Sequence, residues 1–165
     1  MRPLLLTGPP AVGKSTVGRL MAERLRSGAF IDVDNVRHMV VAGHAAPWDA
    51  DEGTRQQRLG VINACSLARN FVAEAIEVVI ADVLTNATAR LYRELLPDVL
   101  IVKREVDFPV AQQRAEQRPI YLTADEFREL HDRQAEFTAA DDRVNTSQPP
   151  AVRTAAAIEQ ARRSS

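Results

Sequence analysis

The interpretation of this chain starts from one stretch near its beginning: residues 4–16 read LLLTGPPAVGKST. Its first part, Leu4–Thr7, is a short apolar run without alternation, which is typical of a strand buried on both faces of a sheet. Its second part, Gly8–Ser15, satisfies the pattern G-x-x-x-x-G-K-[ST]. Apolar residues then recur at helical spacing, at Val17, Leu20, Met21 and Leu25. The stretch therefore predicts a strand, a tight loop and a helix in succession.

A loop of this pattern in this position predicts a binding site for a nucleoside triphosphate and magnesium. Its glycines let the backbone curl around an anion, so that successive N–H groups point inward at a helix N-terminus. Lys14 can reach the β- and γ-phosphates, and the Ser15 hydroxyl can ligate Mg²⁺. The alternative is a simple turn with a surface lysine, which the flanking strand and helix disfavour. The expected nucleotide-binding residues here are Gly8, Pro9, Pro10, Ala11, Val12, Gly13, Lys14, Ser15 and Thr16.

Composition indicates one globular domain. The chain has 165 residues, 45% of them hydrophobic and 26% charged, which excludes a disordered or fibrous protein. Lys and Arg number 21 against 22 Asp and Glu, so a protein held to nucleic acid mainly by phosphate neutralisation is not expected. The one cysteine, Cys65, excludes an intramolecular disulfide and fits a reducing compartment. With no signal-like segment and no run of about 20 apolar residues, we expect a cytoplasmic protein without membrane contact.

Short apolar runs alternate with amphipathic stretches along the chain, and this pattern is typical of an α/β domain with a mostly parallel sheet. After the first strand we expect four more, at residues 30–33, 78–81, 99–102 and 143–145. We expect helices at residues 13–26, from about 35, 54–76, 88–96, 110–117 and 124–138, with a last one opened by Pro149-Pro150. The helix at residues 54–76 is expected to bury a stripe made of Leu59, Ile62, Cys65, Ala68, Val72 and Ile76.

The phosphate-loop pattern alone leaves the reaction open, because switch GTPases, motor ATPases and small-molecule kinases share it. A GTPase needs a guanine-reading N-K-x-D sequence, and no asparagine in this chain is followed by lysine. Larger ATPases normally need a longer module than this one. The sequence therefore favours a kinase.

Two carboxylates at the end of the second expected strand are candidates for the acceptor side of such a reaction. Asp32 and Asp34 flank Val33 there, where open α/β sheets bind their ligands. Asp34 can take the proton from an attacking hydroxyl, and Asp32 can hold magnesium through water. The structural alternative is that Asp34 caps the helix that follows.

The phosphate loop, residues 30–34 (FIDVD) and residues 78–82 (VVIAD) together resemble the small P-loop kinases of the nucleoside-monophosphate-kinase-like fold. Within them the chain is most similar to the chloramphenicol phosphotransferase-like and zeta-toxin-like group, with shikimate and gluconate kinases more distant. The resemblance implies a five-stranded parallel sheet in the order 2-3-1-4-5 with helices on both faces. It also implies ATP as the donor, a base at the position of Asp34, and a small arginine-rich helical lid, at about residues 114–125 here.

The resemblance extends to further site residues. Arg114 and Arg118 lie four apart on one helix face, where lid arginines neutralise charge on the transferring phosphoryl group; a solvated helix face is the alternative. Asp82 can hold magnesium through water or bind an acceptor hydroxyl, unless it is only a turn residue. Ser147 and Gln148 fall in the loop that lies against adenine in such kinases, and that loop is equally a strand-to-helix connection.

Residues around the expected acceptor pocket have weaker support. Arg37, Trp48 and Arg58 are candidates for contacts with the acceptor, although a lone tryptophan more often seals the edge of a core. Arg104 and Arg128 are expected at the surface.

These observations predict an ATP- and Mg²⁺-dependent phosphotransferase that acts on a hydroxyl of a small molecule, such as an antibiotic or other natural product, a sugar or a metabolite. Lys14, Asp34 and Arg118 are the expected catalytic residues, and Ser15 and Asp32 the expected metal ligands. Two alternatives stay open: a nucleoside, nucleotide or nucleic-acid-end kinase, and a non-catalytic ATP-binding regulatory module. Either a monomer or a homodimer is compatible with the sequence.

Overall fold

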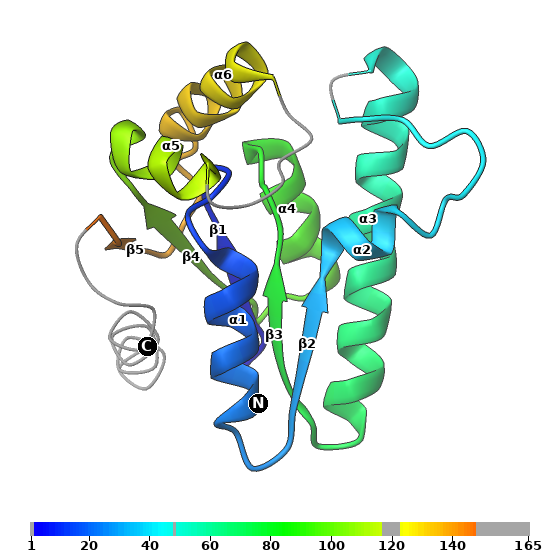
Figure 1. Cartoon of the computed structure of the whole chain (residues 1–165). Helices are drawn as coiled ribbons and strands as arrows, with labels where there is room; N and C mark the ends of the chain where they lie inside the picture. The colour runs from blue at the N-terminus through cyan, green and yellow to red at the C-terminus, as the bar shows by residue number, and fades with distance from the viewer. Residues whose placement is uncertain (1, 48, 117–122, 148–165) are drawn as a thin grey trace.

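The computed structural model describes residues 2–47, 49–116 and 123–147. Its strands form one parallel sheet in the order β2-β3-β1-β4-β5, as the resemblance implied. They are β1 (Leu4–Thr7), β2 (Gly28–Asp32), β3 (Glu77–Ala81), β4 (Leu100–Glu105) and β5 (Asp142–Asn145). Because every strand runs in the same direction, all carboxyl ends meet at one edge of the sheet, the upper edge in Figure 1.

Helices cover both faces of the sheet (Figure 1). They are α1 (Lys14–Glu23), α2 (Val33–Arg37), α3 (Ala50–Ala73), α4 (Asn86–Leu95), α5 (Phe108–Glu116) and α6 (Ala124–Ala135). Leu4 and Leu6 pack with α1, whereas Leu5 packs with α3 and α4 on the other face. Burial on both faces explains why β1 is apolar at every position. No helix among the described residues is long and apolar enough to cross a membrane.

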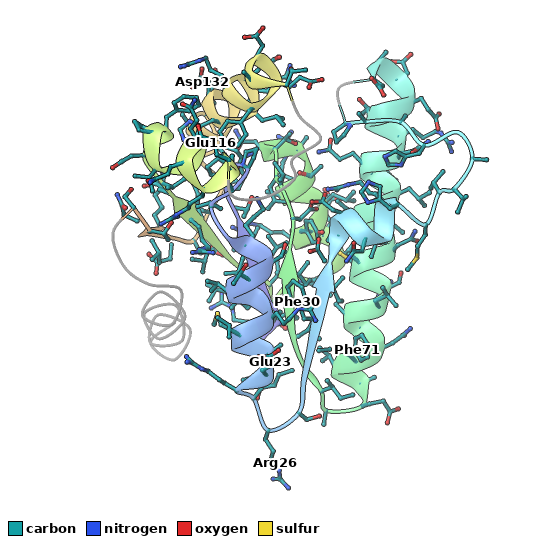
Figure 2. All side chains as sticks on the ribbon, in the orientation of Figure 1. Glu23, Arg26, Phe30, Phe71, Glu116 and Asp132 are labelled. Atoms are coloured by element: carbon teal, nitrogen blue, oxygen red, sulfur yellow. The ribbon has the colours of Figure 1, made fainter. Side chains whose placement is uncertain are left out.

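Close packing of α1 against β2 depends on a glycine. A side chain at Gly18 would place its Cβ 2.5 Å from the ring of Phe30, which lies between the two elements in Figure 2. The guanidinium of Arg19 covers the same ring, with its carbon 5.2 Å from the ring centre. This contact fixes the direction in which α1 leaves the phosphate loop.

The buried face of α3 matches the expected stripe only in part. Cys65 and Ala68 are buried as expected, but Leu59 is 38% exposed, and small residues outside the stripe, including Gly60 and Ala64, also face the core. The reason is the close approach of α2, because a Cβ at Gly60 would lie 2.9 Å from the side chain of Arg37. Helix α3 also begins at Ala50, earlier than the expected start at residue 54.

The fourth strand is longer than expected, and this corrects the placement of Arg104. Strand β4 continues to Glu105 because β5 pairs with it from Val102 to Glu105. Arg104 therefore lies inside the sheet with 3% of its surface exposed, so the prediction of a surface residue is wrong. Arg128 is exposed on α6 and covers the ring of Phe108, with 4.2 Å between guanidinium carbon and ring centre.

Helices α5 and α6 lie at the carboxyl edge of the sheet, beside the loop that joins β1 to α1 (Figure 1). A small apolar cluster joins the loop to both helices, formed by Val12, Val106, Ala111 and Phe127. Figure 2 labels Glu116 on α5 and Asp132 on α6 at this end of the molecule. Much of the expected lid, and the helix expected after Pro149, lie outside the described residues.

Candidate active site

The loop between β1 and α1 has the shape that its glycines allow. Gly8 and Gly13 adopt φ values of 140° and 82°, in the region that favours glycine, and Ala11 shares it with φ 57°. Helix α1 begins directly at Lys14, so its first backbone N–H groups face the loop. The Lys14 ammonium donates hydrogen bonds to the carbonyl oxygens of Gly8 and Pro9, at 2.9 and 3.0 Å. The loop is thus a preformed turn with its lysine folded over it.

We expect Gly8→Ala to disrupt the loop. A Cβ at Gly8 would lie 2.2 Å from the carbonyl oxygen of Arg104, and the residue would also have to keep φ 140°. Strained backbone of this kind costs about 1–3 kcal/mol, and the collision adds to it, so both the free energy of unfolding and nucleotide affinity should fall. Gly43→Ala is the matched control, since Gly43 has φ 72° but nothing within 4 Å of the added carbon. Denaturant unfolding and titration calorimetry measure the difference, and equal losses in the two variants would contradict the account.

Electrostatics at Lys14 connect the loop with the acceptor side. Burial lowers the pKa of Lys14 to about 8, while the carboxylates of Asp34 and Asp82 raise it and the charge of Arg104 lowers it further. The negative charges of both carboxylates thus act on the Lys14 ammonium, because the interaction between charges weakens with distance and both are near. That Lys14, Asp34 and Asp82 act together in one site stays a prediction.

Arg37 bridges the two carboxylates on that side. Its Nη2 donates to Oδ1 of Asp34, and its Nη1 donates to Oδ1 of Asp82 at 3.0 Å. Asp82 is 2% exposed and also accepts from the hydroxyl of Tyr92 at 3.0 Å and from the backbone N–H of Val83 at 2.8 Å. The side chain of Asp34, by contrast, is 60% exposed. The network thus holds one buried and one accessible carboxylate.

Burial and charge oppose each other in this network. Burial disfavours the guanidinium charge of Arg37, but the carboxylates of Asp82 and Asp34 outweigh it and raise the pKa of Arg37. Burial raises the pKa of Asp82, and the nearby guanidinium of Arg37 opposes that rise. Arg37 is therefore a fixed positive charge that positions Asp34.

We expect Arg37→Met to destabilise the protein by about 3–5 kcal/mol, because it leaves the Asp82 carboxylate buried without its cation. The double variant Arg37→Met/Asp82→Asn should regain part of that loss. Arg55→Met serves as the control, since Arg55 pairs with Glu52 in the same i,i+3 spacing at the surface; it should leave stability nearly unchanged. Urea unfolding of the three variants checks this, and an Arg37→Met variant as stable as the native protein would contradict the role given to the network.

Asp32, not Asp34, caps the helix that follows β2. Its Oδ1 accepts from the backbone N–H of Asp34 at 3.2 Å, so the structural alternative considered for Asp34 falls to its neighbour. This cap uses only one of the two carboxylate oxygens of Asp32. Its part as a metal ligand stays a prediction.

The remaining expected site residues are distributed as follows. Arg114 donates to the carbonyl oxygen of Thr146 at 2.7 Å, and the hydroxyl of Ser147 accepts from the backbone N–H of Asp107 at 3.0 Å. These two bonds join α5 to the loop after β5. Arg58 is exposed on α3, outside the Arg37 network. Three further expected site residues, Trp48, Arg118 and Gln148, lie outside the described residues.

Sequence reasoning missed two residues of this region. Tyr92 reaches Asp82 from α4, and no motif marks a tyrosine in the middle of an amphipathic helix. Arg104 lies against the phosphate loop, with a carbonyl oxygen beside Gly8 and a guanidinium beside Gly13. Arg104 follows an apolar run, and the sequence does not show that β4 continues through it. Its burial beside the loop could therefore not be predicted.

The described residues hold no group of three or more His, Cys, Asp and Glu side chains able to bind a metal ion. The oxygen atoms near the loop that could face a metal ion include the Ser15 hydroxyl and the carboxylates of Asp32 and Asp34. Hard oxygen donors in small number suit Mg²⁺, which keeps several waters and takes further ligands from substrate phosphates. The donor set therefore fits magnesium bound together with a nucleotide.

Comparison with solved structures gives matches over nearly the whole chain. Shikimate kinase from Acinetobacter baumannii, in complex with shikimate, is 25% identical, with 99% of this chain and 94% of that chain covered and a TM-score of 0.68. A sugar kinase from Janibacter sp. is 13% identical, with 97% and 93% covered and a TM-score of 0.75. The tunicamycin resistance protein from Deinococcus radiodurans is 17% identical, with 98% and 95% covered and a TM-score of 0.68.

Neither the comparison with protein-family models nor that with curated proteins gives a match. The structural likenesses agree with the strand order of the sheet. The chain thus has the fold and the phosphate loop of the small P-loop kinases.

Proposed function

We propose that this protein is a kinase that transfers the γ-phosphate of ATP to a hydroxyl group of a small molecule. The observation that carries the proposal is the Asp34 carboxylate, which is exposed, held by Arg37, and close enough to the phosphate loop to act on the charge of Lys14. A carboxylate held in this way can serve as a general base. Neighbours named as shikimate kinase and sugar kinase support a hydroxyl acceptor.

The nucleotide would be held by residues 8–16, with Lys14 on its β- and γ-phosphates. Magnesium, when bound with the nucleotide, would neutralise phosphate charge, and Ser15 and, through water, Asp32 would hold it. We assign Arg114, Arg118, Ser147 and Gln148 to further contacts with the nucleotide. The bond from Arg114 to Thr146 keeps the first of them next to the loop that would lie against adenine.

In the proposed reaction, Asp34 accepts the proton of the acceptor hydroxyl while Arg37 holds its carboxylate in place. The hydroxyl oxygen forms a bond to the γ-phosphorus, and the bond from that phosphorus to the β–γ bridging oxygen breaks, so that ADP leaves. Charge on the transferring group would be neutralised by Lys14 and by Arg118 from a lid at about residues 114–125. Closure of a lid excludes water and so limits ATP hydrolysis.

The acceptor pocket would lie between Asp34 and the start of α3. We assign Arg37, Trp48, Arg58 and Asp82 to it, with Arg37 and Asp82 forming its buried floor. The acceptor class that fits is an antibiotic or other natural product, a sugar or a metabolite. A cytoplasmic monomer or homodimer is the expected form of the enzyme.

A panel of acceptors tests the proposal. ATP consumption with Mg²⁺ would be measured in the presence of hydroxylated metabolites, sugars, nucleosides and antibiotics, with Lys14→Met as the inactive control. Stimulation by a sugar, antibiotic or metabolite that is absent in the control supports the proposal. Stimulation by nucleosides or nucleic-acid ends alone would favour the nucleotide-kinase alternative. Tight ATP binding without stimulation by any acceptor would favour a regulatory module.

A further inference from the structure

Arg104 is a buried cation for which the described residues provide no counter-ion. It is 3% exposed, and its Nε and Nη1 atoms have no hydrogen-bond partner among those residues. Its neighbours on β4, by contrast, are satisfied, since Lys103 and Glu105 form an ion pair at 3.5 Å. A buried guanidinium with two idle donors is rare in folded proteins, because the desolvation of such groups is costly.

The charge persists in this surrounding. Burial, and secondarily the charge of Arg114, lower the pKa of Arg104 to about 10, which still leaves the guanidinium protonated at neutral pH. Among the described residues, no negatively charged group therefore neutralises the buried guanidinium of Arg104. An anion arriving at this place would gain hydrogen bonds from donors that have already lost their water.

The position of Arg104 identifies where that anion would be. A Cβ at Gly13 would lie 3.3 Å from Nη1 and 3.8 Å from Nη2 of Arg104, so the guanidinium lies directly against the phosphate loop. Its own carbonyl oxygen lies against Gly8, at the other end of the same loop. Arg104 thus contacts the loop at both glycines of its pattern, and its charge also lowers the pKa of Lys14.

We propose that Arg104 is a further phosphate-binding residue of the nucleotide site, whose buried guanidinium donates hydrogen bonds to phosphate oxygens of the bound nucleotide. The inference rests on the proposed function only in taking the loop to hold a triphosphate. It gives Arg104 opposite effects in the two states: its uncompensated charge disfavours the empty protein and favours the loaded one. Replacing a residue that has only a structural role would not weaken nucleotide binding while leaving the empty protein as stable as before.

The test compares Arg104→Met and Arg104→Lys with the native protein. Arg90→Met is the matched control, since it removes one arginine charge from an exposed position on α4. Denaturant unfolding without ligand gives stability, and titration calorimetry gives the Kd of MgATP and of inorganic tripolyphosphate. We expect Arg104→Met to be at least as stable as the native protein while both Kd values rise about 10- to 100-fold. Arg104→Lys should recover part of the affinity, because it keeps the charge without the planar fork, and Arg90→Met should change neither quantity.

Each other outcome is decisive. Unchanged Kd values in Arg104→Met would overturn the assignment of Arg104 and leave the proposed transfer untouched. A variant that is unfolded or markedly less stable without ligand would show a structural role and overturn it as well. If the native protein bound neither probe, the nucleotide site itself would fail. If Arg104→Met behaved as expected but no acceptor were phosphorylated by the native enzyme, only the proposed function would fail.

Discussion

Replacing Lys14 by methionine is expected to raise the Kd of MgATP by at least about 100-fold and to abolish phosphoryl transfer. The substitution keeps the length of the side chain and removes the charge that the loop positions over its own carbonyl groups. Each charge-assisted hydrogen bond to a phosphate contributes about 1.5–3 kcal/mol, and one lysine can donate to both the β- and γ-phosphates. Titration calorimetry and an ATP-consumption assay measure the two effects.

A matched control for Lys14→Met is Arg19→Met. It removes one positive charge from the same helix at an exposed position whose guanidinium lies over the Phe30 ring. We expect it to leave the affinity for MgATP close to the native value. Retained affinity in Lys14→Met, or equal losses in both variants, would show that the loop does not bind a nucleotide as proposed.

Asp34→Asn is expected to lower kcat by about 10²- to 10⁴-fold, which is the usual contribution of a general base. Asparagine has the same size and can still accept a hydrogen bond from Arg37, so the local geometry should persist. The affinity for MgATP should change little, because Asp34 is placed on the acceptor side. Steady-state kinetics with the best acceptor of the panel, together with calorimetry, separate these two quantities.

Asp98→Asn is the control for that variant. Asp98 is exposed in the turn before β4, at the edge of the sheet opposite to the phosphate loop. It should leave kcat unchanged. A native kcat in Asp34→Asn would exclude this carboxylate as the base and would leave its contact with Arg37 as a structural one.

The local structure around the phosphate loop is predictable from the sequence. Residues 4–16 specify a buried strand, a loop and a helix through side-chain pattern and glycine conformation alone, and the structure places each where expected. Asp34 could be placed at the carboxyl edge because it directly follows an apolar run. The order of the strands, by contrast, came from the resemblance to known kinases, since pattern alone does not determine which strands pair.

The rest depends on contacts between distant residues. Arg37 and Asp82 are both candidate site residues by sequence, but they are 45 positions apart and nothing in the sequence indicates that they pair. Helix α3 has small residues on its buried face because α2 packs against Gly60. The spacing of large apolar residues in the sequence does not indicate this contact. Arg104 was placed at the surface because charged residues usually are, and only its pairing opposite Val144 of β5 shows that it is buried.

Transfer of the γ-phosphate to a hydroxyl of a small molecule can be followed at the phosphorus atom itself. Phosphorus NMR of a mixture of the protein, ATP, Mg²⁺ and the best acceptor identifies the product without any coupled enzyme. We predict that a phosphate ester of the acceptor accumulates as ATP is converted to ADP, and that Asp34→Asn forms it far more slowly. Release of all the γ-phosphate as inorganic phosphate, with every acceptor tested, would contradict the account.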